Sequence, residues 1–303
     1  MNFTTLSKYF EKLEETSSRL ALIDILCDLF KGVKPDEIAE VCYLLQGRVA
    51  PFYEPVEIGM NEKLVAQAMA RAYGVERKEI LKEFGKVGDL GNVAQRHSEL
   101  VSESKKRSRN KFGMTVKDVF ETLTAIANTQ GEGTVDKKIS MLSGLLEKMD
   151  GISAKHLLRI PLGASRLGIG DPTILDAFAK LKLGDKDLLR SRSDDGIALA
   201  RRTLPSDEAS ERKSRRKLLE SAYNKVSDLG LVGETLWKHG LAGVQKLDVM
   251  VGRPIRSELC ERITDPKAIL GKFGGKTHVQ YKYDGFRVQI HKDGDQIRLF
   301  SRN

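Results

Sequence analysis

The stretch 280–287 reads Gln280, Tyr281, Lys282, Tyr283, Asp284, Gly285, Phe286 and Arg287. It places a lysine at the end of a predicted strand, then a glycine turn that lets the backbone approach a ligand, then an arginine. In this KxDGxR pattern Lys282 is a candidate nucleophile towards a nucleotide phosphate, because neighbouring cations favour the unprotonated amine and neutralise phosphate charge. Short patterns also recur by chance, so a polar β-turn remains an open interpretation of these residues alone.

Alternating polar and apolar residues predict a small sheet around this turn. Val288 and Ile290 alternate with polar neighbours, so one face of their strand is expected to join a core. Asp293-Gly294 is a strong signal for a hairpin. A short helix is predicted to begin at Asp265. The expected strands are 277–283, 286–292 and 296–300.

The chain before about residue 235 has helical periodicity instead. Apolar residues recur every three or four positions, as at Leu22, Leu26 and Leu29. The accompanying start and stop signals are Ser18, Pro35–Glu37, Asn61 with Gly74, Thr115 with Asp118, and Asp171-Pro172. The predicted fold class is therefore multidomain, with an all-α part at 1–240 and the start of an α+β domain at 241–303.

Composition narrows the class of protein. Hydrophobic residues make up 40% and charged residues 31% of 303 residues, which suits a packed core. A net charge of +9 favours a polyanionic partner such as nucleic acid. Cys27, Cys42 and Cys260 are widely spaced, which indicates reduced thiols rather than disulfides. Without a signal peptide or membrane-spanning run, we expect a soluble cytoplasmic protein.

Two glycine-rich loops and two basic clusters are candidate anion contacts. The loops are 131–134 and 162–171, and glycines before a helix expose backbone N–H groups to an anion. Arg166 in the second loop can add a phosphate or minor-groove contact, although an ordinary turn is the commoner meaning of such a loop. The clusters are 105–111 and 212–217, which are expected to be a solvated loop and an exposed helix face.

A family resemblance covers nearly the whole chain. The segments YKYDGFRVQIH (281–291) and LFSRN (299–303) resemble the first two nucleotide-contacting motifs of the ATP-dependent DNA ligases of archaea and eukaryotes. Further segments resemble that family in the same order and are LLQGRVAP (44–51), GDLGNVA (88–94), LGASRLGIGDPTILDAFA (162–179), SAYNKVSDLGLV (221–232) and GRPIR (252–256). The resemblance implies a helical DNA-binding domain followed by a nucleotidyltransferase, or adenylation, domain.

For DNA binding, the resemblance implies contacts from the second glycine-rich loop. In the family this helical domain grips the minor groove around a nick, so Gly163, Arg166 and Gly168 take DNA-contact roles by position. Ala164 and Ser165 depart from the lysine and leucine that the family often has there.

For catalysis, the resemblance implies that Lys282 attacks the α-phosphorus of ATP and carries AMP, which passes to the 5′-phosphate at a nick before the 3′-hydroxyl seals the strand. Phosphoryl transfer of this kind implies Mg²⁺. Arg287 and Arg302 are then phosphate or ribose contacts, and Asp284 orients Lys282 or the metal. Gln280 stands where the family usually has glutamate near the adenine, which leaves nucleotide preference open.

The resemblance stops inside the adenylation domain. The family's main acidic metal-binding motif would lie beyond Asn303, so the metal ligands are unknown, and we expect the 303 residues to bind nicked DNA but to adenylate poorly. A sliding clamp is a possible partner without a clear binding box, since only Phe112 is available, and a monomer is expected. The alternatives are an RNA ligase or capping enzyme sharing KxDGxR, and a DNA-binding module with an inactive catalytic stub. The resemblance implies a role in DNA replication, repair or recombination, and the sequence does not say whether replication or repair is the setting.

Overall fold

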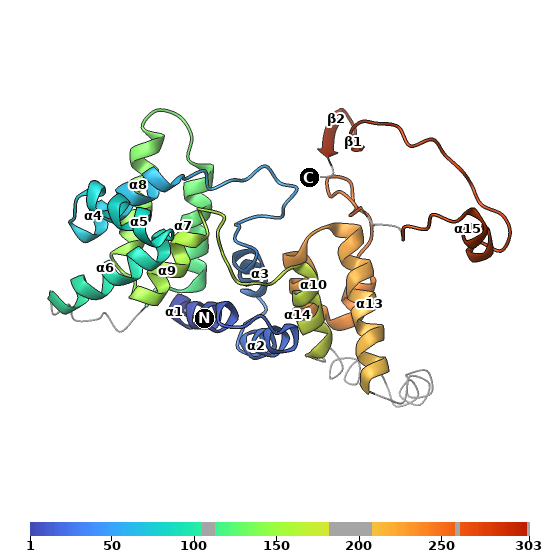
Figure 1. Cartoon of the computed structure of the whole chain (residues 1–303), viewed down its shortest axis with the longest axis horizontal. Coiled ribbons are helices and arrows are strands. Elements are labelled where there is room, and N and C mark those ends of the chain that lie inside the picture. Colours follow the sequence, from blue (N-terminus) through green and yellow to red (C-terminus); the bar gives the residue numbers. More distant parts are fainter. Residues whose placement is uncertain (105–112, 182–207, 258–260, 302–303) are drawn as a thin grey trace.

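The computed structural model describes residues 1–104, 113–181, 208–257 and 261–301, and in these it contains thirteen α-helices and one two-stranded sheet (Figure 1). The helices are α1 Phe3–Glu14, α2 Arg19–Lys31, α3 Ile38–Leu45, α4 Glu62–Tyr73, α5 Arg77–Val87, α6 Leu90–Ser104, α7 Val116–Asn128, α8 Thr134–Leu146, α9 Gly151–Arg159, α10 Asp171–Lys180, α13 Glu208–Val226, α14 Leu229–Gln245 and α15 Pro266–Lys272. The predicted class, helical and then mixed, is confirmed. The cluster 105–111, Phe112, Cys260 and Arg302 lie outside the described residues.

The helices form two groups that share one hydrophobic core (Figure 1). In the first group α6 packs on α9, and α4 packs on α8. In the second group α3 packs on α14, and α10 lies against both α2 and α13. Helix α1 contacts α9 on one side and α2 on the other, so it joins the groups. Within the described part of the chain, no helix is long and apolar enough to cross a membrane.

Local sequence signals placed most helix ends correctly. The Ser18 side chain accepts a hydrogen bond from the Ala21 amide at the start of α2. Thr115 and Asp118 form the predicted capping box, with both reciprocal hydrogen bonds present. Helix α4 ends at Gly74, whose φ of +70° is the left-handed conformation that glycine adopts without strain. These ends are set by contacts within four residues, which is why the sequence predicts them.

One helix start differs from the prediction, and another has the predicted position but not the predicted cap. Helix α3 begins at Ile38 rather than at Pro35, because residues 35–37 form a separate turn in which the Glu37 amide donates to the Lys34 carbonyl. Helix α10 begins at Asp171 with a proline in its first turn, as predicted, but Asp171 is not its cap; Gly170 holds the cap position and offers no side chain. The Asp171 carboxylate is instead occupied by side chains distant in the sequence, described below.

The two strands form the predicted hairpin. β1 (Val288–Asp293) pairs antiparallel with β2 (Gln296–Ser301), and Asp293 lies opposite Gln296. The turn residues are therefore Gly294 and Asp295, one position later than Asp293-Gly294, and Gly294 has the positive φ (+56°) of such a turn.

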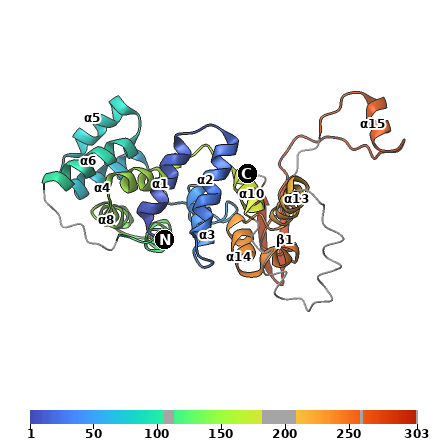
Figure 2. The same cartoon turned by 90° about the horizontal axis from the view of Figure 1, so that it is seen from below.

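The rest of the predicted sheet was wrong in two respects. Residues 277–283 form no strand, and Val279 and Tyr281 are 89% and 88% exposed; a strand needs a hydrogen-bonded neighbour, and this segment loops away from the helices between α15 and β1 (Figures 1 and 2). The apolar face of β1 is also exposed. Its polar face, with Gln289 and His291, turns towards the segment after α14, residues 246–257, which is called the linker here. There Gln289 exchanges two hydrogen bonds with the Ile255 backbone.

Candidate nucleic-acid interface and catalytic segment

The loop between α9 and α10, residues 160–170, is called the interface loop here. Gly163 and Gly168 both have left-handed backbones, with φ of +64° and +65°, and both are exposed. Arg166 lies between them and is also left-handed, with φ of +52°, a conformation uncommon for a residue with a side chain. Leu167 is buried and anchors the loop. The structure thus brings the three predicted DNA-contact residues together on one exposed turn.

Asp89 ties this loop to the helical core. One carboxylate oxygen, Oδ1, accepts hydrogen bonds from the amides of Gly91 (2.7 Å) and Asn92 (3.3 Å) in the first turn of α6. The other, Oδ2, pairs with Arg159 at 2.7 Å and with Arg166 at 3.1 Å. Burial alone would raise the pKa of Asp89. The hydrogen bond from Arg159 and the positive charges of Arg159 and Arg166 outweigh burial and lower this pKa below its usual range. Asp89 is therefore an anion that orients the exposed Arg166 side chain.

Arg159 extends this contact into a partly buried ionic cluster. Its guanidinium also pairs with Glu14 at 2.7 Å, and Lys155 bridges Glu14 and Glu11 at 2.9 and 2.8 Å. His156 Nε2 lies 2.8 Å from Glu11. Burial would raise the pKa of Glu14, yet hydrogen bonds from Arg159 and Lys155 lower it to about 2. The cluster joins α1 to α9 and supports the base of the interface loop.

The same cluster contains the geometry of a metal site. Ligand atoms of Glu11, Glu14 and His156 lie within 4.8 Å of one another. Both carboxylates, however, already receive the Lys155 ammonium, and Glu14 also receives Arg159. A cation bound there would compete with two buried positive charges, so the cluster is better explained as a structural ion-pair network.

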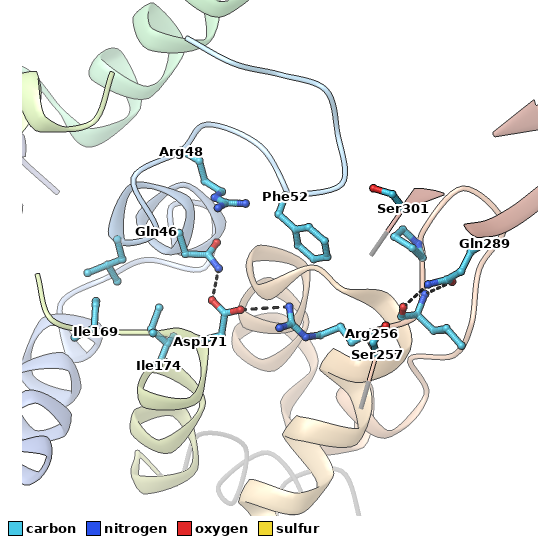
Figure 3. A pocket seen from close by; sticks show the side chains of 14 residues that line it. Gln46, Arg48, Phe52, Ile169, Asp171, Ile174, Arg256, Ser257, Gln289 and Ser301 are labelled. Carbon is cyan, nitrogen blue, oxygen red and sulfur yellow. Dashed lines mark hydrogen bonds and ion pairs between the residues drawn. The ribbon is translucent and has the colours of Figure 1, made fainter. Parts of the chain in front are cut away.

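Asp171 organises a second site, where the helices meet the linker (Figure 3). Its carboxylate accepts hydrogen bonds from Gln46 Nε2 (2.7 Å) and from the Tyr223 hydroxyl, and it pairs with Arg256 at 3.3 Å. The Arg256 guanidinium lies over the ring of Tyr223, 4.5 Å from its centroid. Gln46 and Arg256 lie in segments that resemble the family, but no local pattern predicts their role, because their meeting with Asp171 depends on contacts across 125 and 85 positions.

These residues line a cavity of about 510 Å³, called the Arg48 pocket here (Figure 3). It is bordered by the end of α3, the interface loop, the start of α10, the linker and the hairpin. The lining residues are Leu45, Gln46, Arg48, Phe52, Ile169, Gly170, Asp171, Ile174, Pro254, Ile255, Arg256, Ser257, Gln289 and Ser301.

The predicted catalytic residues lie elsewhere. Gln280, Lys282, Asp284 and Arg287 are all exposed, and among the described residues none of them makes a hydrogen bond or an ion pair. The structure does not bring them into a common pocket. Arg302 falls outside the described residues, so its predicted role is not tested.

The second basic cluster differs from the exposed helix face predicted for it. On α13, Arg215 is buried and its Nε donates to the Ala179 carbonyl at 2.9 Å. Arg216 is half-buried and pairs with Asp176 of α10 at 2.7 Å. Lys213 and Lys217 are exposed as expected. Two arginines therefore hold α13 against α10, and only part of the cluster faces solvent.

Two protein-family models match this chain. The family model described as "DNA ligase N terminus" matches residues 2–179, and the one described as "ATP dependent DNA ligase domain" matches residues 257–303.

Curated relatives agree with these matches. A probable DNA ligase of Dictyoglomus turgidum is 40% identical over 303 residues, covering 100% of this chain and 46% of the relative. DNA ligases of Sulfolobus acidocaldarius and Nitrosopumilus maritimus are 39% and 36% identical, again over 100% of this chain and over 47% and 46% of their own lengths. The chain thus spans about half the length of the curated relatives it matches. Because the DNA ligase N-terminus model matches residues 2–179, which is more than half of the sequence, this chain belongs to the DNA ligase family.

Proposed function

We propose that the chain contains the DNA-binding domain and the beginning of the adenylation domain of an ATP-dependent DNA ligase that seals nicks in duplex DNA. The observation that carries this proposal is the match of residues 2–179 to the DNA ligase N terminus, over a helical core that presents Gly163, Arg166 and Gly168 on one exposed loop. The net charge of +9 supports a polyanionic substrate. The second match, over residues 257–303, includes Lys282.

We place the domain division near residue 240, with a DNA-binding domain at 1–240 and the beginning of an adenylation domain at 241–303. Gly240 supports this division, because it interrupts α14 with a non-helical backbone (φ +61°, ψ −167°). Val244 still packs into the helical core, so the structural change is complete only a few residues later.

In the proposed reaction the Lys282 amine displaces pyrophosphate from ATP and holds AMP through a nitrogen–phosphorus bond. AMP then passes to the 5′-phosphate of the nick, and the 3′-hydroxyl displaces it. Arg287 and Arg302 would neutralise phosphate charge, and Gln280 would hydrogen-bond the adenine. A magnesium ion would add charge neutralisation, and Asp284 suits it, because Mg²⁺ in such sites takes one or two carboxylates together with substrate phosphates.

The family match favours this proposal over its alternatives. RNA ligases and capping enzymes share the KxDGxR chemistry, but the long helical region here matches a DNA ligase model. A binding module with an inactive stub predicts no role for Lys282. The exposed, unpaired state of Lys282 in the described residues makes us expect weak adenylation by the 303-residue chain.

Labelling with α-labelled ATP and magnesium, followed by denaturing electrophoresis, tests the catalytic part. We expect a faint labelled band in the wild type and none in Lys282→Ala, whereas Lys276→Ala, which removes another exposed lysine of the same segment, should keep it. A band that survives Lys282→Ala would reject Lys282 as the nucleophile. No band in any variant would support the inactive-stub alternative.

Fluorescence anisotropy with a nicked duplex, measured over a range of salt concentrations, tests the DNA-binding part. We expect affinity to fall steeply with salt, and Arg166→Ala to reduce the slope of log affinity against log salt by about 1. Arg77→Ala, which removes an exposed arginine of α5, is the matched control and should leave the slope unchanged. Equal slopes in all three proteins would remove Arg166 from the interface.

A further inference from the structure

Arg48 is a half-buried cation whose charge the protein leaves uncompensated. It follows Gly47 directly after α3, and its guanidinium extends along the wall of the Arg48 pocket (Figure 3). Its Nε atom is enclosed from solvent and has no hydrogen-bond partner. Within the described ranges, the side chain makes no hydrogen bond or ion pair at all. Burying an unpaired donor of a charged group destabilises a protein, so such an atom calls for an explanation.

The pocket holds no spare carboxylate to pair with it. Asp171 is the one acidic residue among those that line the cavity, and its oxygens are already taken by Gln46, Tyr223 and Arg256. Two arginines against one aspartate leave the pocket with a net positive charge. A guanidinium without a protein partner, beside a second guanidinium held in place, is suited to an anion with several acceptor oxygens.

The position of the pocket favours phosphate as that anion. Ile169 and Gly170, at the end of the interface loop, form part of its wall, so the pocket adjoins the loop that presents Arg166. Ser257 and Ser301 also line the cavity. A cavity of about 510 Å³ lies within the size range of small-ligand sites and accommodates a phosphate with its adjoining sugar.

We propose that the Arg48 pocket is a phosphate-binding subsite, in which Arg48 holds a backbone phosphodiester of bound DNA where the helical domain meets the linker and hairpin. This inference rests on the proposed DNA-binding function and adds a contact outside the interface loop. The same chemistry would accept a free phosphate or pyrophosphate, so the experiment includes both sources.

The decisive variant is Arg48→Met, which keeps much of the side-chain length and removes the charge. In nicked-duplex anisotropy with the 303-residue chain, we expect affinity to fall about tenfold and the salt slope to fall by about 1. Thermal unfolding should show an equal or higher Tm, because the variant removes a buried unsatisfied donor; a merely structural arginine would lower Tm. Arg77→Met, on α5 in the first helical group, is the matched control and should change neither property.

A second arm uses inorganic phosphate and pyrophosphate as probes in thermal unfolding. If either anion raises the Tm of the wild type but not of Arg48→Met, while both proteins show the same DNA slope, the subsite exists and takes free phosphate. Unchanged DNA binding together with equal anion effects in both proteins would overturn the proposal. A wild type that fails to bind DNA would reject the proposed DNA-binding function, and the anion arm would then decide the Arg48 pocket by itself.

Discussion

The helical part, residues 1–247, and the C-terminal segment, residues 261–301, differ in how they complete their own structure. The helices bury a continuous core that includes Phe10, Leu26 and Leu123. In the C-terminal segment no residue is buried, and the hairpin leaves Ile290 and Leu299 exposed on one face. A helix satisfies its backbone internally and needs only one face covered, whereas a strand needs neighbours along its edge. The backbone hydrogen bonds of the helical part are thus made locally, whereas those of the C-terminal strands depend on a neighbouring strand.

Arg159→Met should give the largest effect within the helical part. The substitution leaves the buried carboxylate of Asp89 and the half-buried carboxylate of Glu14 without the Arg159 guanidinium, so the free energy of unfolding should fall by about 3–5 kcal/mol. Urea unfolding followed by helical circular dichroism measures it.

Arg166→Ala is the control for that prediction. It removes another partner of the same Asp89 oxygen, but the Arg166 side chain is 53% exposed, so the loss should stay below about 1 kcal/mol. Comparable losses in both variants would mean that burial does not set the strength of these ion pairs, and the contrast between buried and exposed regions would weaken.

A matched pair of leucine substitutions tests the contrast directly. Leu123→Ala removes a fully buried side chain of α7 and should lower the free energy of unfolding by about 2–5 kcal/mol. Leu299→Ala removes one that is 65% exposed on β2 and should change it by less than about 0.5 kcal/mol. Thermal unfolding of the two variants side by side measures the difference. A large effect of Leu299→Ala would show that the hairpin face is covered in solution.

The difference between local and long-range contacts also explains which features of the structure the sequence predicted. Helix ends such as Ser18 and the Thr115–Asp118 box depend on neighbouring residues and were found correctly. Asp171 was misassigned as a cap, because its partners lie 52, 85 and 125 positions away. Arg48 and Asp89 lie in segments that resemble the family. Nothing in their local pattern shows that the Arg48 guanidinium lacks a partner or that the Asp89 carboxylate pairs with two arginines.

The expected strand at 277–283 failed for a related reason. Its β-prone residues meet the requirement of local propensity, but propensity contributes little until a second strand supplies hydrogen bonds. The roles given to Lys282 and Asp284 depend on such long-range placement as well. They therefore remain proposals that the labelling experiment addresses.

Among the substitutions of buried side chains, His156→Gln gives the smallest predicted effect, and it tests burial through pH. Burial lowers the pKa of His156 to about 4, with Lys155 and Arg159 acting in the same direction, although the hydrogen bond to Glu11 opposes them. In the unfolded chain, His156 therefore binds a proton below about pH 6.5, whereas in the folded protein it binds one only below about pH 4. This contribution to stability is complete above pH 6.5 and is lost as pH falls towards 4, by about 2 kcal/mol between pH 7 and pH 5.

Glutamine can donate to Glu11 in the same place without titrating, so His156→Gln should flatten the dependence of unfolding free energy on pH between 6.5 and 4.5. Glu14, with its lowered pKa, should continue to lose stability at lower pH, from about 4.5 towards 2. The control, His278→Gln, alters an exposed imidazole of the C-terminal segment and should retain the wild-type profile. Urea midpoints measured at half-unit pH steps separate the two substitutions. An unchanged slope in His156→Gln would mean that His156 takes up its proton in the folded state beside Glu11, so that this ion-pair cluster accommodates charge as readily as the exposed segment does.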